Sequence, residues 1–461
     1  MANLSVINLN NVTAVGAKRE GMDSPSHSLA LLPKYESYKE SGAEWLGEIP
    51  DNWELISLKR LLKFHTGGTP PSGNQQFYDG DLPWITIADL NERFTNRHHC
   101  LSRLGVRQAR IPLTPKGSLL YSFKLSIGQV AFASTDIYTN EAIASFIPRD
   151  NLNLNYYYYA LPIFLENNAA VNIYGAKLLN QDLIKNAWIL KLDDDEQTRI
   201  ANFLDQKTTQ IDEAIAIKEQ QISLLKERKQ IIIQQAVTQG LDPNVPMKDS
   251  GVDWIGKIPA HWEVKRLKYV LEERNERSKT GEEPLFMVSQ IHGLVVRADY
   301  HDKAEVAASN IDNKVVYKND LVFNKLKAHL GVFFKSNIEF KGLVSPDYAV
   351  YKCKEHISDA KYLEILFRHP SYIQQFIIRA TGVVEGLIRL YTGDLFDIPV
   401  PVAPSGEQAE ILAYTKSQSS AYEKAIEIQQ NQIEKLKEYK TSLINSAVTG
   451  KIKITPEMVE Q

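Results

Sequence analysis

Cysteine is scarce in this chain of 461 residues, which holds only Cys100 and Cys353. Two cysteines so far apart exclude a disulfide framework or a thiolate metal cluster, and they predict two inert thiols in a reducing cytoplasm. No apolar run approaches the roughly 18 residues of a membrane span. Residues 1–34 lack the cationic start and apolar core of a secretion signal, so they predict a disordered extension. We therefore expect a soluble cytoplasmic protein with no membrane partner.

An excess of positive charge is also missing, because the formal net charge is −3. Domains that bind nucleic acid usually carry a basic footprint. Any affinity for phosphate must therefore come from local groups of Lys and Arg rather than from the chain as a whole.

Sequence motifs for chemistry on DNA are absent too. An amino-methyltransferase needs Asp or Asn before two prolines and an aromatic residue, whereas the only Pro-Pro pair lies in Thr69-Pro70-Pro71-Ser72. A phosphate-binding loop ends in Gly-Lys-Ser or Gly-Lys-Thr, but here Gly450-Lys451 is followed by Ile452. The sequence therefore predicts no catalytic residue, no metal site and no cofactor bound by this chain.

What the chain does contain is an internal repeat. KESGAEWLGEIPDNWELISLK at residues 39–59 returns as KDSGVDWIGKIPAHWEVKRLK at residues 248–268. EQTRIANFL from Glu196 aligns without a gap with EQAEILAYT from Glu407, and each of these two segments runs on to an Ala-Val-Thr sequence. Each copy thus consists of a Trp-bearing opening, a globular stretch and a long helix.

The two long segments are predicted to pair. Residues 198–237 contain no Gly or Pro, and their apolar residues recur at coiled-coil spacing, as do the aligned residues of the second copy. The second helix must run back if the stripes meet, so the pair would be antiparallel; alternatively, each helix packs only on its own domain. The expected pairing residues are Ile211, Ile215, Ile222, Leu225 and Ile232, and in the second copy Tyr422, Ile426, Ile433, Leu436 and Leu443.

The globular stretches mix both kinds of secondary structure. Strands are predicted at residues 84–90, 117–123, 129–134, 285–290, 320–326 and 331–336, and helices at residues 156–165 and 362–376. GSLLYSFKLSIGQVAF can be laid on DLVFNKLKAHLGVFFK, which places Lys124 at Lys327 and Gly128 at Gly331. The copies therefore share a fold, but their globular contents have diverged, as expected if they bind different things.

Five runs together resemble one family. They are the openings EWLGEIPDNWE and DWIGKIPAHWE, the run GGTPPSGNQQFYDGDLPWITIADL, the segment IPVPVAPSGEQAEIL and the ending AVTGKI. Over about residues 35–455 the chain resembles the specificity subunit of type I restriction-modification systems, HsdS. The second copy departs from the family pattern because it lacks a GGTP run.

The resemblance implies an α+β fold with a pseudo-two-fold internal repeat. Two mixed α/β target recognition domains would be separated by two long conserved helices that form an antiparallel coiled coil. The expected parts are a disordered extension at 1–34, recognition domain 1 at 35–195, helix 1 at 196–240, recognition domain 2 at 241–405, and helix 2 with the C-terminal tail at 406–461.

The resemblance also implies a function without chemistry. Each recognition domain would bind one half of a bipartite, asymmetric site in double-stranded DNA. The helices would bind two methyltransferase (M) subunits, and restriction/motor (R) subunits would join them. S-adenosylmethionine, ATP and Mg²⁺ would be used by those partner subunits, for adenine methylation or DNA cleavage, and not by this chain.

Polar residues in predicted loops and strand ends are the candidates for DNA contact. Lys and Arg can neutralise phosphates, and a few side chains can reach base edges in the major groove. In the first copy the candidates are Gly67, Gly68, Thr69, Arg93, Asn96, Arg97, Ser122 and Lys124, and in the second copy Arg297, Asn324, Lys325, Lys327 and Ser345.

Three alternatives stay open at the level of sequence. Gly67 and Gly68 either let backbone approach a phosphate or form a plain turn, and Lys124 and Lys327 either face DNA or are merely solvated. The run Tyr156–Tyr159 either stacks on bases or belongs to a core. The whole chain, finally, is either a DNA-specificity subunit or a coiled-coil adaptor that reads no sequence.

Overall fold

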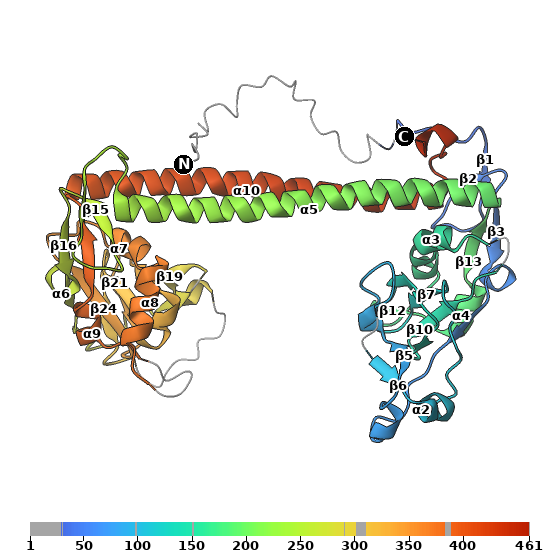
Figure 1. Ribbon diagram of the computed structural model, residues 1–461, viewed down its shortest axis with the longest axis horizontal. Coiled ribbons are helices and arrows are strands. Elements are labelled where there is room, and N and C mark those ends of the chain that lie inside the picture. Colours follow the sequence, from blue (N-terminus) through green and yellow to red (C-terminus); the bar gives the residue numbers. More distant parts are fainter. Residues whose placement is uncertain are drawn as a thin grey trace. The chain divides into compact units, whose positions relative to one another are not determined.

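The computed structural model describes residues 29, 31–96, 99–149, 152–289, 291–300, 310–382 and 389–460. The chain divides into two compact units, the first made of residues up to Lys218 together with Asn431–Gln461, and the second of Glu219–Gln430 (Figure 1). Each unit therefore contains one globular stretch and part of both long helices. Within the described ranges, no helix has the length and apolar character needed to cross a membrane.

A four-stranded antiparallel sheet forms the centre of each unit. In the first unit the order is β4 (Phe64–Thr66), β10 (Ile143–Phe146), β7 (Leu119–Ser122) and β8 (Val130–Phe132). In the second unit the order is β17 (Leu271–Glu273), β24 (Tyr348–Cys353), β21 (Leu321–Asn324) and β22 (Phe333–Lys335). The matching order confirms the repeat and the α+β class.

Helices cover one face of each sheet. The first unit uses α3 (Leu154–Asn167), and the second uses α7 (Ala360–Leu366) and α8 (Pro370–Arg379). The predicted helix over residues 362–376 is interrupted because Pro370 starts a new helix, with His369 as its N-cap. Tyr156, Tyr157 and Tyr159 of α3 are buried, so the tyrosine run belongs to the core rather than to a base-stacking surface.

Smaller elements complete the two units. In the first they are β5 (Leu82–Ile85), β6 (His99–Leu101), α2 (Arg103–Gln108), β9 (Tyr138–Thr139), β11 (Ala170–Val171), β12 (Lys177–Leu178) and α4 (Gln181–Asn186). In the second they are α6 (Leu267–Val270), β18 (Phe286–Ser289), β19 (Gly293–Val296), β20 (Lys314–Val316), β23 (Gly342–Val344) and α9 (Thr392–Phe396).

Each repeated opening forms a hairpin followed by a strand that pairs with the segment before a long helix. The hairpins are β1 (Tyr38–Glu40) with β2 (Glu48–Pro50), and β14 (Met247–Asp249) with β15 (Lys257–Pro259). The following pairs are β3 (Glu54–Ser57) with β13 (Trp188–Lys191), and β16 (Glu263–Arg266) with β25 (Pro399–Val402).

The second tryptophan of each opening is fully buried and bonds to the start of a long helix. The Trp53 indole N–H donates to Glu196 Oε2 at 2.8 Å, and that of Trp262 donates to Glu407 Oε2 at 2.9 Å. The repeated Glu therefore fixes each opening to the first turn of a helix. This contact explains why Trp and Glu return together in both copies.

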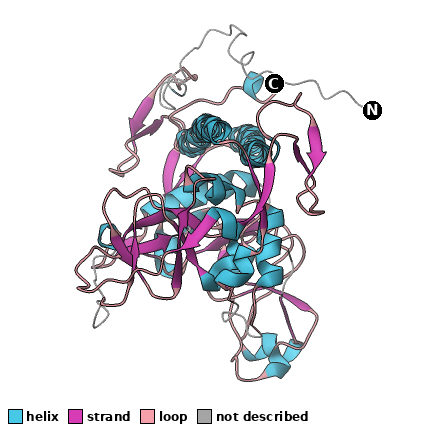
Figure 2. Cartoon of the chain, turned by 90° about the vertical axis from the view of Figure 1, so that its left-hand side faces the viewer, coloured by secondary structure: helices cyan, strands magenta, loops and turns pink. Residues whose placement is uncertain are grey.

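The long helices are α5 (Asp194–Gln239) and α10 (Ser405–Val448), and they lie side by side in antiparallel directions (Figures 1 and 2). Within the first unit Lys440 pairs with Asp212 at 2.7 Å, and within the second Lys229 pairs with Glu423 at 2.6 Å. These two ion pairs are equivalent under the repeat. The predicted stripe supports the pairing, since Ile211, Ile215, Leu436 and Leu443 share one core cluster.

The two ends of the described chain meet in the first unit. The backbone N–H of Lys453, beyond the end of α10, donates to the carbonyl of Pro33 at 2.7 Å. The Lys451 ammonium donates to the carbonyls of Leu46 and Glu48 at 2.9 and 2.7 Å. In this unit the opening of copy one therefore packs against the end of copy two, as a circular repeat requires.

The sequence alignment of the globular stretches was wrong by one residue in the first strand. Leu119 pairs with Phe132 and Leu321 with Lys335, so Leu119 corresponds to Leu321, whereas the alignment placed it at Val322. The turn of the second unit is longer by one residue. Lys124 and Lys327 are consequently not equivalent, although Gly128 and Gly331 both have positive φ.

Candidate nucleic-acid interface

One edge of the first sheet brings together several predicted residues. Strands β4 and β7 end at this edge, and β10 begins there, because Thr66 pairs with Ala144 and Ser122 with Ile143. The loop Gly67–Thr69, the turn after β7 and the segment before β10 therefore lie next to one another. Lys124 in this turn is exposed.

The Gly67–Thr69 loop is held in place by specific contacts. A Cβ on Gly67 would overlap the Thr139 backbone, so glycine is required there for packing and not for approach to a phosphate. The Gly68 N–H donates to the Thr139 carbonyl at 2.9 Å, and the Gly68 carbonyl accepts the Trp84 indole N–H at 3.2 Å. A rigid loop of this kind can present Thr69 at a fixed position.

Glu141 is a residue at this edge that the sequence analysis missed. The Thr69 hydroxyl donates to its carboxylate and thereby holds the pKa of Glu141 below its usual value. An exposed carboxylate repels phosphate, but it can accept a hydrogen bond from the amino group of cytosine in the major groove. No motif in the sequence marked Glu141, because only the sheet order brings residues 69 and 141 together.

Ser122 cannot contact DNA as predicted. Its side chain is fully buried, its hydroxyl donates to the Ser126 carbonyl, and it accepts the Gln129 N–H at 3.0 Å. These bonds shape the turn that carries Lys124. Ser122 therefore supports the candidate interface from inside.

Arg93 and Asn96 do not join this group. The Arg93 guanidinium binds both carboxylate oxygens of Asp205 on α5, at 2.6 and 2.9 Å, and lies 4.9 Å from the centre of the Tyr158 ring. It fastens the domain to the helix and is not free to bind phosphate. Asn96 is exposed but donates to Glu92 at 2.7 Å, and Arg97 lies outside the described residues.

The equivalent edge of the second sheet carries the second group of predicted residues. Asn324 ends β21 opposite Tyr348, where β24 begins, and Ser345 precedes that strand. Ser345 and Arg297 line one hollow of about 510 Å³ together with Asn313. The structure thus brings Arg297 and Ser345 together, although they are far apart in sequence.

The lysines at this edge differ in their availability. Lys327 is exposed, whereas Lys325 is largely buried and lies 3.7 Å from Glu273. Glu273 also binds the buried Lys314 at 3.3 Å. Burial and the neighbouring Lys325 lower the pKa of Lys314. Lys325 is therefore part of an internal charge cluster, and Asn324 is also engaged, since its Oδ1 accepts the Leu326 N–H at 3.0 Å.

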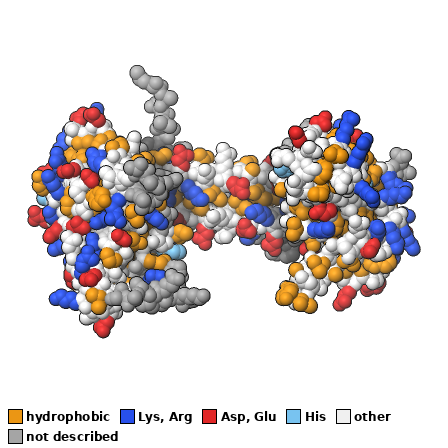
Figure 3. Space-filling view, turned by 90° about the horizontal axis from the view of Figure 1, so that it is seen from below, with side chains coloured by type: hydrophobic (Ala, Val, Ile, Leu, Met, Phe, Trp, Pro, Cys, Tyr) orange, Lys and Arg blue, Asp and Glu red, His pale blue; other side chains and the backbone are white. Residues whose placement is uncertain are grey.

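Two further features of the described part of the chain concern metal binding and thiol chemistry. No group of three or more His, Cys, Asp or Glu residues is placed to hold a metal ion among the described residues. Burial raises the pKa of the Cys353 thiol to about 12, so this thiol stays protonated at neutral pH. Lys and Arg are interspersed with Asp and Glu on the face of the molecule seen in Figure 3.

Two copies of one binding domain, each with polar loops at the same edge of its sheet, define a two-site recognition protein built on paired helices. The comparisons agree with this class. Residues 50–227 match the family described as the type I restriction modification DNA specificity domain.

The MjaIX specificity subunit of a type I restriction enzyme from Methanocaldococcus jannaschii is 23% identical over 430 residues, covering 89% of this chain and 95% of that protein. The HsdS subunit of Thermoanaerobacter tengcongensis has a similar fold, with a TM-score of 0.53 at 14% identity, covering 90% of this chain and all of that one. A chain from a structure of complex assembly in a type I system has a TM-score of 0.63 at 13% identity, covering 87% of this chain and 98% of that one. Over most of its length the chain is therefore similar to HsdS-type specificity subunits.

Proposed function

We propose that this chain is the non-catalytic subunit that selects the DNA sequence for a type I restriction-modification complex. The observation that carries the proposal is the pair of equivalent sheet edges with different chemistry. The first edge presents Thr69, Lys124 and the carboxylate of Glu141, whereas the second presents Arg297, Ser345 and Lys327. Equivalent sheet edges that carry different sets of side chains support two different half-sites.

The candidate base contacts follow from hydrogen-bonding capacity. Glu141 is suited to accept from the N4 amino group of cytosine, and Arg297 is suited to donate to O6 and N7 of guanine. Lys124 and Lys327 are suited to phosphates. Two domains attached to one helix pair would each meet the groove at a set phase, so the half-sites would be separated by a constant gap.

The repeated helices supply the proposed binding surfaces for two methyltransferase subunits. The ion pairs Lys440–Asp212 and Lys229–Glu423 are equivalent under the repeat, and equivalent surfaces favour two equivalent contacts. Restriction subunits would join through this assembly. S-adenosylmethionine, ATP and Mg²⁺ would be bound by those partners, which would carry out the chemistry.

A genome-wide map of N6-methyladenine tests the proposal directly. Cells expressing this chain with its methyltransferase partner would show a split, asymmetric motif that is missing without the chain. Glu141→Ala would relax only one half-site and Arg297→Ala only the other, each by about 1–3 kcal/mol of discrimination. A complex that co-purifies but methylates no motif would instead indicate an adaptor without sequence readout.

A further inference from the structure

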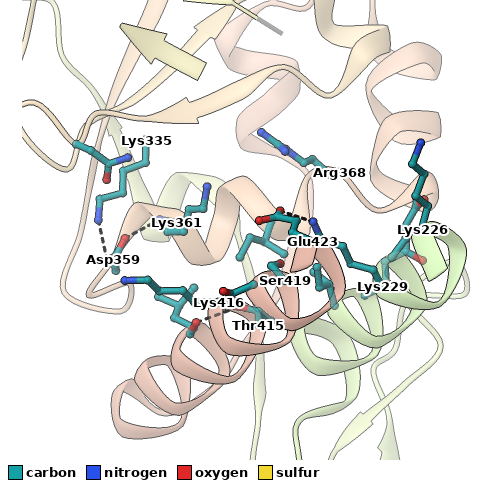
Figure 4. A pocket seen from close by; sticks show the side chains of 17 residues that line it. Lys226, Lys229, Lys335, Asp359, Lys361, Arg368, Thr415, Lys416, Ser419 and Glu423 are labelled. Atoms are coloured by element: carbon teal, nitrogen blue, oxygen red, sulfur yellow. Dashed lines mark hydrogen bonds and ion pairs between the residues drawn. The ribbon is translucent and has the colours of Figure 1, made fainter. Parts of the chain in front are cut away.

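A basic cleft lies between the helix pair and the globular domain of the second unit (Figure 4). It has a volume of about 920 Å³, and its lining includes the apolar side chains of Ile233, Ile365 and Leu412. Its six cationic side chains come from α5, α10, β22, α7 and the turn after α7. They are Lys226, Lys229, Lys416, Lys335, Lys361 and Arg368.

Carboxylates neutralise only part of this charge. Lys335 binds Asp359 at 2.8 Å and Lys229 binds Glu423 at 2.6 Å. Lys361 and Arg368 share the single carboxylate of Glu364, at 2.6 and 3.0 Å. The cleft therefore holds six cationic side chains that, in the described part of the chain, are opposed by only these three carboxylates.

Lys226 and Lys416 provide the cations that remain available. Both are exposed, and neither forms an ion pair with a carboxylate of the described residues. The two lysines lie on different helices, α5 and α10, on the wall of the cleft opposite the globular domain. Their ammonium groups can therefore turn toward an anion in the cleft at little cost.

The first unit keeps Lys437 and Lys440 as the counterparts of Lys226 and Lys229, but it lacks two other cations of the cleft. The gapless helix alignment places Asp205 at Lys416, and the strand registers place Phe132 at Lys335. Asp205 is occupied by Arg93 and by the Tyr159 hydroxyl at 2.6 Å, while Phe132 stacks on Tyr158 with ring centres 5.6 Å apart. An ion pair and aromatic rings fill the region in one copy, and cations line a cleft in the other.

The cleft continues across the surface of the second unit. Lys335, Lys361 and Arg368 also line a neighbouring hollow of about 240 Å³, which reaches His292 in the turn between β18 and β19. The cations thus follow an extended path rather than surrounding a single point. An extended anion with repeated charges fits this path better than a small one.

We infer that this basic cleft binds backbone phosphates of DNA, apart from the base-reading edges, and that only the second unit does so. Lysine is suited to this contact because a phosphate needs a charge and not a fixed geometry. A chain with a net charge of −3 must obtain its affinity for DNA from such local surpluses. The inference rests on the proposed function, because it assumes that the ligand is DNA.

The test uses the whole chain in complex with its methyltransferase partner and the double variant Lys226→Gln/Lys416→Gln. Binding to a duplex with the methylated motif and to one without it is measured across a range of salt concentrations. The slope of log Kobs against log salt should fall by about 2, or about 1 for each lysine. If the curves meet at 1 M salt, affinity at 0.1 M should fall roughly 60-fold for both duplexes, at about 0.9 of slope per phosphate.

Lys424→Gln/Lys437→Gln is the matched control. Both lysines are exposed on α10 outside the cleft, and Lys437 is the counterpart of Lys226 in the first unit. This variant should keep the wild-type slope. Lys416→Asp, which introduces the residue of the first copy, should weaken binding to both duplexes more than Lys416→Gln does.

Two results would overturn the inference. An intact complex with an unchanged salt slope would show that no phosphate lies near these lysines. Loss of the methyltransferase subunit on purification of the double variant would show that an acidic segment of that partner occupies the cleft. Failure of the proposed function is separate, because it would appear with the wild-type chain as the absence of any methylated motif.

Discussion

Glu196→Ala should loosen the first opening from the start of α5. The Glu196 carboxylate is buried and accepts from the Trp53 indole at 2.8 Å and from the Tyr35 hydroxyl at 2.7 Å. Alanine removes these two charge-assisted bonds, together with a longer one from the Asn52 amide at 3.4 Å, and leaves the Trp53 and Tyr35 donors without an acceptor. A bond to a charged group contributes about 1.5–3 kcal/mol, and an orphaned buried donor costs about 1–3 kcal/mol. Because these costs overlap, we expect a loss of about 3 kcal/mol in the stability of the first unit.

The second copy supplies an internal comparison. Glu407 accepts from Trp262 at 2.9 Å and lies 2.7 Å from His261 Nε2, but its side chain is 22% exposed. Water can replace part of the hydrogen bonding that Glu407→Ala removes, so we expect the stability of the second unit to fall by about 1–2 kcal/mol. Glu196→Gln keeps one acceptor oxygen and should restore about half of the loss.

Hydrogen exchange followed by mass spectrometry is the appropriate assay, because a chain with two units need not unfold in one step. Glu196→Ala should reduce protection in residues 48–57 and in the first turn of α5, while the opening around Trp262 keeps its protection. Thermal unfolding of the first unit should shift by roughly 2–4 °C for each kcal/mol. Unchanged protection around Trp53, or equal effects of the two alanine variants, would refute the reasoning.

Three further predictions concern chain order, pH and spacing. A permutant opened near Pro243, with residues 33 and 455 joined by a short linker, should assemble and methylate the same motif, because the Lys453 N–H already donates to the Pro33 carbonyl. A soluble permutant that fails to assemble would contradict the circular layout. The Nδ1 atom of His369 caps α8 by accepting the Ser371 N–H at 3.2 Å, and burial lowers the pKa of this histidine. The stability that neutral His369 gives to the second unit is therefore present above pH ~6.5 and is lost as the pH falls below it. His369→Asn should keep the cap and flatten this dependence in urea unfolding of the second unit at pH 5 to 7, and an unchanged pH slope would exclude His369 as its source. Inserting four residues after Lys218 and four after Gln430 should lengthen the gap between the half-sites by about two base pairs, because each helical residue adds about 1.5 Å. The half-sites themselves should not change, and a methylome with the original gap would contradict the spacing model.

The repeat is visible as direct sequence similarity, and local periodicity predicted both long helices and two strands of each four-stranded sheet, β7 with β8 and β21 with β22. The other two strands of each sheet, β4 with β10 and β17 with β24, were not predicted. The stripe from Ile211 to Ile232 repeats at coiled-coil spacing, and the strands around Leu120 and Val322 are short β-rich runs. The alignment between copies failed by one residue because both candidate registers place apolar residues in the strand. A turn with one added residue decides the register, and the sequence contains no signal for it.

Candidate site residues were harder to predict because burial and pairing depend on distant parts of the chain. Ser122 and Arg93 have the chemistry of DNA-binding residues, but one shapes a turn and the other binds Asp205 on α5. Conversely, Glu141 has no distinguishing sequence context and enters the site only because β10 begins beside the end of β4. Residue type therefore indicated a region of each sheet, but not which of its side chains are available for contact.

The openings and long helices are similar between the two copies, whereas the sheet edges differ, and this contrast has a physical cause. Trp53 bonds to Glu196 of its own copy and shares a core cluster with Ala447 and Val448 at the end of the other copy, and Gly450 lies against Pro50 and Trp53, so a change in one must suit two elements. Residues at the sheet edges, such as Lys124 and Ser345, are exposed and touch few neighbours. Substitution there costs little stability and changes what is bound. Selection for stability would thus preserve the openings and the long helices, whereas selection for new sequence specificity would change the sheet edges.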